Sequence, residues 1–159
     1  MKIVFNTSPL IFLTRLELLE QFLSQTEEYL APQAILDEIQ AKQDDVSLSL
    51  KTLFAAQKIK IQSIQMTTLA NSLNQRLGRG ESEAITLALE LNAHYIILDD
   101  FAARRDASRL GLQVKGTLAI IKKLHQEGQI TLDNLDEFYE RLIRIGFRVK
   151  RSLFDEIFT

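Results

Sequence analysis

The sequence alternates short apolar runs with longer stretches in which apolar residues recur at helical spacing. The short runs have the composition of strands and fall at residues 2–5, 29–31, 58–64, 95–98 and 112–114. The helical stretches lie at residues 10–22, 33–42, 48–57, 67–76, 81–91, 101–110, 117–126, 132–145 and 150–158. Strands that alternate with helices predict an α/β domain with a mainly parallel sheet flanked by helices. The polar–apolar alternation of 58–64 predicts an edge strand.

The composition is that of one folded domain. The chain has 159 residues, of which 46% are hydrophobic and 25% charged, and this length is sufficient for a sizeable core. We find no repeat, linker or low-complexity segment, and therefore predict a single domain over residues 1–159. The chain has no cysteine, which excludes disulfides, thiolate metal sites and cysteine nucleophiles. Two histidines alone argue against a histidine-based zinc site.

The charge balance limits the kind of partner. The net charge of −2 and the pI near 5.7 argue against broad, non-specific binding of nucleic acid, although they leave room for a local basic strip. The chain opens directly into an apolar run that soon meets charged residues, so we expect no signal peptide. No apolar stretch has the length of a membrane span. We therefore expect a protein without a membrane partner, located in the cytoplasm.

Two aspartates follow the most apolar predicted strand. Asp99 and Asp100 come directly after residues 95–98, and active sites of parallel sheets lie at the carboxyl ends of strands. Two crowded carboxylates repel each other, and a divalent cation with oxygen ligands, Mg²⁺ or Mn²⁺, would compensate that repulsion. The pattern indicates a metal-dependent phosphoryl-transfer or nuclease site. The alternative is that both aspartates simply cap the following helix.

Helical phase selects among the other acids. Glu81 opens a predicted helix on the side of its apolar stripe, whereas Glu83 shares its face with Glu90 and is expected to face solvent. In the helix at 33–42, Glu38 flanks the buried face and Asp37 points nearly opposite to it. Glu81 and Glu38 are therefore the better ligand candidates. The alternatives are a capping acid at Glu81 and an ordinary boundary residue at Glu38.

Asn6 ends the first predicted strand and can offer a cation a neutral side-chain oxygen. With the acids, it makes a predicted oxygen-lined cluster of Asn6, Glu38, Glu81 and either Asp99 or Asp100. Each of these residues comes from a strand end or a helix start.

Three motifs in this order resemble PIN-domain proteins, and more narrowly the prokaryotic branch of VapC-like ribonucleases. They are NTSPL at residues 6–10, GESEAI at 80–85 and DDFAAR at 99–104. Further agreement at residues 110–117 and 146–148 extends the resemblance from residue 3 to about residue 155.

The resemblance implies a three-layer PIN-like fold and a Mg²⁺- or Mn²⁺-dependent endoribonuclease. Many proteins of this branch are the toxins of toxin–antitoxin pairs and are often dimeric, which implies an RNA substrate, a cognate antitoxin and a homodimer. By position, Asn6 replaces the family's first aspartate, while Glu38, Glu81 and Asp100 match its acids. Asp99 is the alternative to Asp100. The neutral amide of Asn6 lowers the negative charge that would attract the cation.

Other polar residues near the motifs are candidate substrate ligands. Thr7 or Ser8 could hydrogen-bond the phosphate or the attacking water, or could cap the first helix. Arg104 and Arg105 could meet the RNA backbone, or could lie on a solvated surface. A second basic segment binds RNA or an acidic antitoxin segment, or is a plain exposed helix face: Arg141, Arg144, Arg148, Lys150 and Arg151.

Two other functions fit the same residues. The first is a catalytically weak or inactive PIN-fold module that binds RNA or protein, suggested by Asn6 in place of an aspartate. The second is another metal-dependent phosphohydrolase, because acidic strand ends serve many such enzymes.

Overall fold

A computed structural model describes residues 1–24 and 26–159 of the chain. At its centre five parallel strands form a sheet in the order β3-β2-β1-β4-β5. The strands are β1 (Lys2–Phe5), β2 (Glu28–Pro32), β3 (Lys60–Gln62), β4 (Tyr95–Ile97) and β5 (Val114–Lys115). Ile3 of β1 pairs with Tyr29 of β2 and with Tyr95 of β4, which puts β1 in the middle. β3 lies at an edge, as its alternating pattern predicted.

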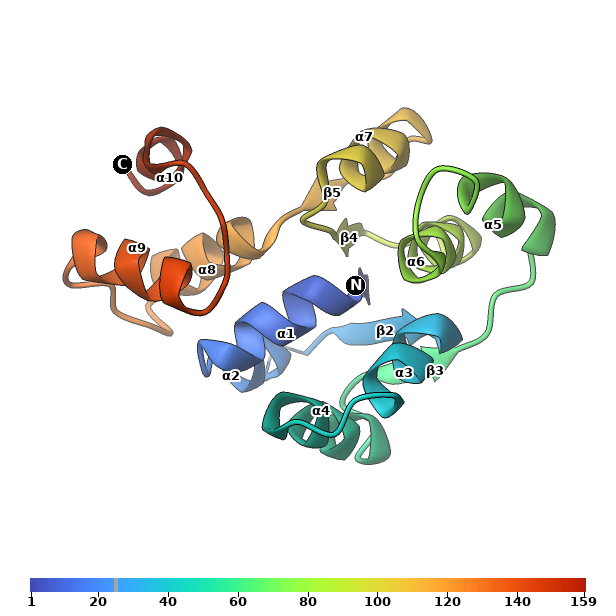
Figure 1. The fold of residues 1–159 in the computed structure, drawn as a ribbon, viewed down its shortest axis with the longest axis horizontal. Helices are drawn as coiled ribbons and strands as arrows, with labels where there is room; N and C mark the ends of the chain where they lie inside the picture. The colour runs from blue at the N-terminus through green and yellow to red at the C-terminus, as the bar shows by residue number, and fades with distance from the viewer. Residues whose placement is uncertain (25) are drawn as a thin grey trace.

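Helices cover both faces of this sheet (Figure 1). They are α1 (Thr7–Arg15), α2 (Leu19–Leu23), α3 (Gln33–Gln40), α4 (Asp45–Ala55), α5 (Thr67–Leu73), α6 (Arg79–Glu90), α7 (Phe101–Arg109), α8 (Thr117–Gln126), α9 (Leu135–Arg144) and α10 (Arg151–Phe158). None of these described helices is long and apolar enough to cross a membrane.

The strands separate two hydrophobic cores because successive side chains point to opposite faces. Ile3 and Phe5 enter the core shared with α1, α2, α4 and α8, and Val4 enters the core shared with α5, α6 and α7. Figure 1 shows α5, α6 and α7 gathered on one side of the sheet, opposite α1, α2 and α4. The predicted three-layer α/β fold is thereby confirmed.

The predicted helix at residues 10–22 is wrong in one respect, because the structure divides it into α1 and α2. Glu17 adopts a positive φ of 60°, and the N–H of Leu18 donates to the carbonyl of Leu13 (2.9 Å). This is a helix-ending motif in which glycine normally takes the left-handed position. With glutamate there instead, the sequence carries no visible stop signal.

At two other helices, a side-chain cap explains why the observed start differs from the predicted one. Asp44 accepts the N–H of Ser47 (2.8 Å), so α4 begins at Asp45, before the predicted start at residue 48. Asn134 accepts the N–H of Glu137 (3.2 Å), so α9 begins after the predicted start at residue 132. Both residue types are strong N-caps, and they decide the boundary over the apolar periodicity.

Candidate functional site

The carboxyl ends of β1 and β4 meet at one edge of the sheet. The N–H of Asn6 donates to the carbonyl of Ile97 (3.2 Å), which fixes the two strand ends side by side. The Asn6 residue is only 6% exposed and occupies the N-cap position of α1, yet its side chain makes no capping hydrogen bond. A buried amide that does not cap its helix is free to serve another partner at this edge.

Three carboxylates from different elements gather beside Asn6. We call Glu38 of α3, Glu81 of α6 and Asp100, which precedes α7, the acidic cluster. Burial raises the pKa of Glu81 above its ordinary value, and the negative charge of Asp100 raises it further. A hydrogen bond to the Gly78 backbone opposes the shift, while a hydrogen bond with Asp100 and the charge of Glu38 add to it. Glu81 therefore lies within electrostatic reach of both other acids.

The Glu81 carboxylate is also incompletely satisfied. Its Oε2 atom is buried and has no hydrogen-bond partner among the described residues. A buried carboxylate oxygen without a donor is costly, because the group has lost its hydration without gaining a replacement. A cation or a bound water would supply the missing partner.

Glu38 is held against Glu81 by a hydroxyl and by a glycine. Thr7 Oγ1 donates to Glu38 Oε2 at 2.6 Å and so orients this acid, while its contact with substrate stays a prediction. On the other side, a Cβ atom added at Gly80 would overlap Glu38 Oε1 and approach Ile35 Cδ1 to 3.1 Å. Glycine at residue 80 is thus required for the Glu38 carboxylate to lie this close to the start of α6.

The structure separates the two aspartates that the sequence left as alternatives. Asp100 caps α7 by accepting the N–H of Ala103 with Oδ2 (3.0 Å), and it is the aspartate that faces Glu81. Asp99 accepts the N–H (2.8 Å) and the hydroxyl (2.6 Å) of Thr117, the first residue of α8. The capping alternative is therefore right for Asp100, but Asp99 binds the start of a different helix.

Asp99 is engaged in structural contacts and is turned away from the acidic cluster. Burial raises its pKa, and the hydrogen bonds from Thr117 and the charge of Arg104 partly offset that effect. Arg104 is half-buried, and its Nη1 donates to the carbonyl of Leu98 (2.9 Å). This nitrogen thus braces the strand end, and the contact of Arg104 with RNA stays a prediction. Arg105 and Ser8 are exposed.

The expectation that Glu83 faces solvent is wrong. Its side chain is 14% exposed, and it accepts the N–H of Ala34 (3.1 Å) and the Nε–H of Arg79 (3.0 Å). The same guanidinium contacts Asp37 at 3.1 Å, so Asp37 also faces α6. These contacts tie the start of α3 to α6 and so place Glu38 beside Glu81.

The sequence carried one signal for the role of Glu83. Pro32 occupies the N-cap position of α3 and makes no side-chain cap, so the first N–H groups of α3 need an acceptor from elsewhere in the fold. Helical phase alone assigned Glu83 to the outside of α6. It took no account of a second helix packed against that face.

The second basic segment does not form one continuous strip. Helix α9 ends at Arg144, and Gly146 turns the chain with a φ of +91°. Arg141 donates to the carbonyl of Leu16 (3.1 Å), and Arg151 pairs with Asp136 (2.5 Å) and Asp155 (2.9 Å).

The donor set at the cluster fits a divalent cation, although a complete site is not preformed. All candidate ligands are oxygens, and Glu81 Oε2 lacks a partner among the described residues. However, no three histidine, cysteine or acidic side chains within residues 1–24 and 26–159 form a group that could hold a metal ion. Mg²⁺ is commonly bound by one or two carboxylates plus water and substrate phosphate. The pair Glu81 and Asp100 meets that smaller requirement.

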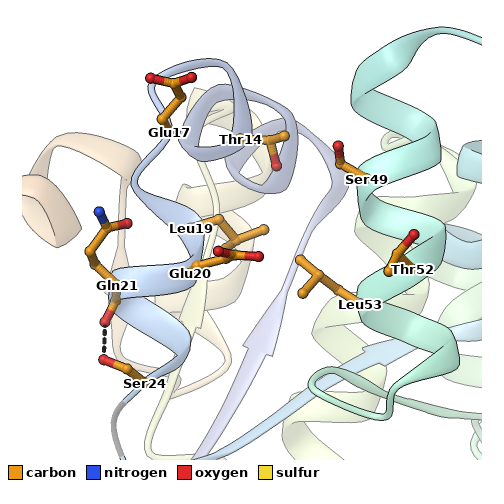
Figure 2. Close-up of a pocket in the computed structure, with 9 residues that line it drawn as sticks. All are labelled: Thr14, Glu17, Leu19, Glu20, Gln21, Ser24, Ser49, Thr52 and Leu53. Carbon is orange, nitrogen blue, oxygen red and sulfur yellow. Dashed lines mark hydrogen bonds between the residues drawn. The ribbon is translucent and has the colours of Figure 1, made fainter.

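A cavity of about 750 Å³ lies elsewhere, between α1, α2 and α4 (Figure 2). Its polar lining includes Glu17, Glu20 and Thr52, and Figure 2 shows Glu20 of α2 and Thr52 of α4 on facing helices, with Glu17 in the turn between α1 and α2. None of the predicted site residues lines it, so this cavity is distinct from the acidic cluster.

Comparison with known proteins identifies the fold family. A family model described as PIN domain matches residues 2–159, almost the whole chain. A search of curated proteins finds no match. PIN domains are generally nucleases and typically use divalent metal ions. The extent of the match, together with the parallel sheet and its acidic edge, shows that this chain belongs to the PIN-domain family.

Proposed function

We propose that this protein is a metal-dependent endoribonuclease and the toxin component of a toxin–antitoxin pair. The observation that carries the proposal is the buried Oε2 of Glu81, which has no hydrogen-bond partner among the described residues. Its side chain lies beside Asp100 and Glu38 at the carboxyl edge of a PIN-domain sheet. A site that crowds carboxylates and leaves one without a donor is poised for a cation, and RNA phosphates bring their own negative charge to such a cation.

In this proposal each residue of the site has a defined task. Glu81 and Asp100 would hold Mg²⁺ or Mn²⁺, and the Asn6 amide oxygen would offer a neutral third ligand. Glu38, oriented by the Thr7 hydroxyl, would take the proton of an attacking water as its oxygen bonds to phosphorus and the P–O bond to the leaving ribose oxygen breaks. The leaving oxygen takes up a proton from solvent. The bound cation would polarise the scissile phosphate and lower the pKa of coordinated water. Burial of Glu81 strengthens these electrostatic interactions.

Asp99 acts in this scheme by positioning other groups. Its hydrogen bonds to Thr117 anchor α8 to the end of β4, from which Asp100 extends. Arg104, which binds the carbonyl of Leu98, braces the same strand end. The wider biological role rests on the family resemblance, and on that ground we propose an antitoxin partner, a homodimer and action in the cytoplasm.

A second function is favoured by one specific observation. The residue at the end of β1 is a buried amide, and the described residues contain no ready group of three metal-binding acids. A protein with these features could bind RNA in the same place without cutting it.

Cleavage of single-stranded RNA with Mn²⁺ or Mg²⁺ tests the first function against the second. Glu81→Gln and Asp100→Asn should abolish cleavage, whereas Glu20→Gln, a change at an exposed acid in the separate cavity, should leave it intact. Asn6→Asp should raise the affinity for Mn²⁺ because it adds a charged ligand. If the wild type binds RNA but neither it nor Asn6→Asp cuts it, the binding-only function is correct.

A further inference from the structure

One aromatic side chain stands outside every core of the protein. The chain has nine phenylalanines, and Phe101 alone among them is exposed, at 78% of its surface. Among the described residues, seven of the other eight phenylalanine rings lie in aromatic pairs and Phe54 packs in the core, whereas Phe101 does neither. Phe101 directly follows Asp100, so an unpartnered aromatic face lies next to the acidic cluster.

Phe101 lies on the wall of a groove of about 580 Å³. Phe147 and the half-exposed Leu153 supply further apolar surface, and Asp99 marks the end of the groove at the tip of β4. Asp99 and Phe101 line this groove, while Asp100 between them faces Glu81. The groove and the acidic cluster therefore lie on either side of the same short segment, and Asp100 connects the two groove residues along the chain.

The charge along this groove is strongly positive in a protein of net charge −2. Arg104, Arg148 and Lys150 line it, and Arg148 and Lys150 take part in none of the ion pairs found among residues 1–24 and 26–159. A second cavity of about 570 Å³ adjoins the groove, because both are lined by Ala119 and Ile157. Three more cations border that cavity: Lys115, Lys122 and Lys123. Six cations thus line the two cavities beside two acids, Asp99 and Glu156, and one of the six, Lys123, also pairs with Glu127 (3.6 Å).

We propose that this groove is a binding site for single-stranded RNA, in which a nucleobase stacks on Phe101 and the phosphates run past Arg148 and Lys150 toward the lysines of α8. An exposed aromatic ring beside a basic track is the combination that binds unpaired nucleotides without reading their sequence. A duplex would keep its bases stacked on one another and could not use the ring. The proposal rests on RNA being the substrate of the acidic cluster.

The chain contains no tryptophan, which makes Phe101→Trp a specific reporter of stacking. The binding experiment uses the full-length protein in EDTA, so that cleavage cannot occur, with a labelled single-stranded RNA of about ten nucleotides and its duplex form. Anisotropy gives the affinities of the wild type, Phe101→Ala, Phe101→Trp and Leu110→Ala. Leu110 is the matched control because it is an exposed apolar residue at the other end of α7 and does not line the groove.

Loss of one stacked base should weaken single-strand binding by a factor of about 5–150 in Phe101→Ala. Leu110→Ala should bind like the wild type. Phe101→Trp should retain affinity, and its introduced tryptophan should be quenched by single-stranded RNA and much less by the duplex. Arg148→Gln and Lys150→Gln should each reduce the salt dependence of binding, because each removes a phosphate contact.

The proposal is overturned if Phe101→Ala binds single-stranded RNA as the wild type does, or if saturating RNA leaves the tryptophan emission unchanged. It is also overturned if an acidic, apolar peptide quenches that emission and RNA does not, because the groove would then be a protein-docking site. Metal-free binding is independent of catalysis. If the protein binds RNA through Phe101 but does not cleave it with metal, the nuclease proposal is contradicted and the RNA-binding groove is supported.

Discussion

Asp100 has two roles in the structure that substitutions can separate. Its Oδ2 caps α7 through the N–H of Ala103 (3.0 Å), and its negative charge helps to raise the pKa of Glu81. Asparagine is as good an N-cap as aspartate, but it carries no charge. Alanine removes both the cap and the charge.

In EDTA, Asp100→Asn should unfold at the same temperature as the wild type or slightly above it, because the cap is kept and a repulsion is removed. Asp100→Ala should lose about 0.5–2 kcal/mol, the usual cost of a missing N-cap. For a domain of this size each kcal/mol corresponds to about 2–4 °C in Tm. Thermal unfolding followed by circular dichroism measures all three proteins.

Saturating Mn²⁺ should raise the Tm of the wild type above that of both variants. A ligand present at about 100 times its Kd stabilises the folded state by about 2.7 kcal/mol, and only the wild type should receive that gain in full. Both Asp100 variants should also lose RNA cleavage by more than about 100-fold, since direct ligands matter more than their outer partners.

Asp99→Asn is the matched control for these measurements. It should destabilise the protein by about 1–3 kcal/mol with and without metal, because the amide has one oxygen to accept the two hydrogen bonds from Thr117, while leaving the Mn²⁺ stabilisation intact. The reasoning is refuted if Mn²⁺ stabilises the wild type and Asp100→Asn equally. It is also refuted if Asp100→Asn is as unstable as Asp100→Ala in EDTA.

Two further predictions concern pH and the approach of Glu38. Folding raises the pKa values of Glu81 and Asp99, so the folded state holds protons that the unfolded chain has released. The free energy of unfolding without metal should therefore fall as the pH rises above the ordinary carboxylate pKa values. Urea unfolding across that pH range should show a shallower decline for Glu81→Gln than for the wild type. Gly80→Ala should displace the Glu38 carboxylate and lower cleavage by about 10–100-fold while Tm changes by only a few degrees; unchanged cleavage rates would remove Glu38 from the mechanism.

The fold could be predicted from the sequence because the spacing of apolar residues distinguishes its helices from its strands. The fully apolar run before Asp99 and the alternating run that became β3 gave a buried strand and an edge strand. The division between α1 and α2 could not be predicted, because Glu17 occupies a left-handed position that sequence rules assign to glycine. Its cost is met by the tertiary contacts of Leu16 and Leu19, which are both buried.

The candidate site could be predicted in part, for a related reason. Strand ends and helix starts are readable locally, and they brought Glu81 and Glu38 into consideration. Successive residues at a strand end point in opposite directions, so the choice between Asp99 and Asp100 depends on Thr117, a partner 18 residues away. The same limit applies to Glu83, whose partner Ala34 is 49 residues away.

The acidic cluster offers a physical reason for an amide, rather than a carboxylate, at residue 6. Glu81 already has a raised pKa, caused by burial and by two neighbouring carboxylates. An aspartate at residue 6 would add a fourth charge to a buried pocket and would increase that repulsion whenever no cation is bound. The amide supplies an oxygen to the same place without that cost, in exchange for weaker attraction of the cation. The resulting site would depend on substrate phosphate to complete the binding of its metal, and RNA bound along the Phe101 groove would deliver that phosphate to the acidic cluster.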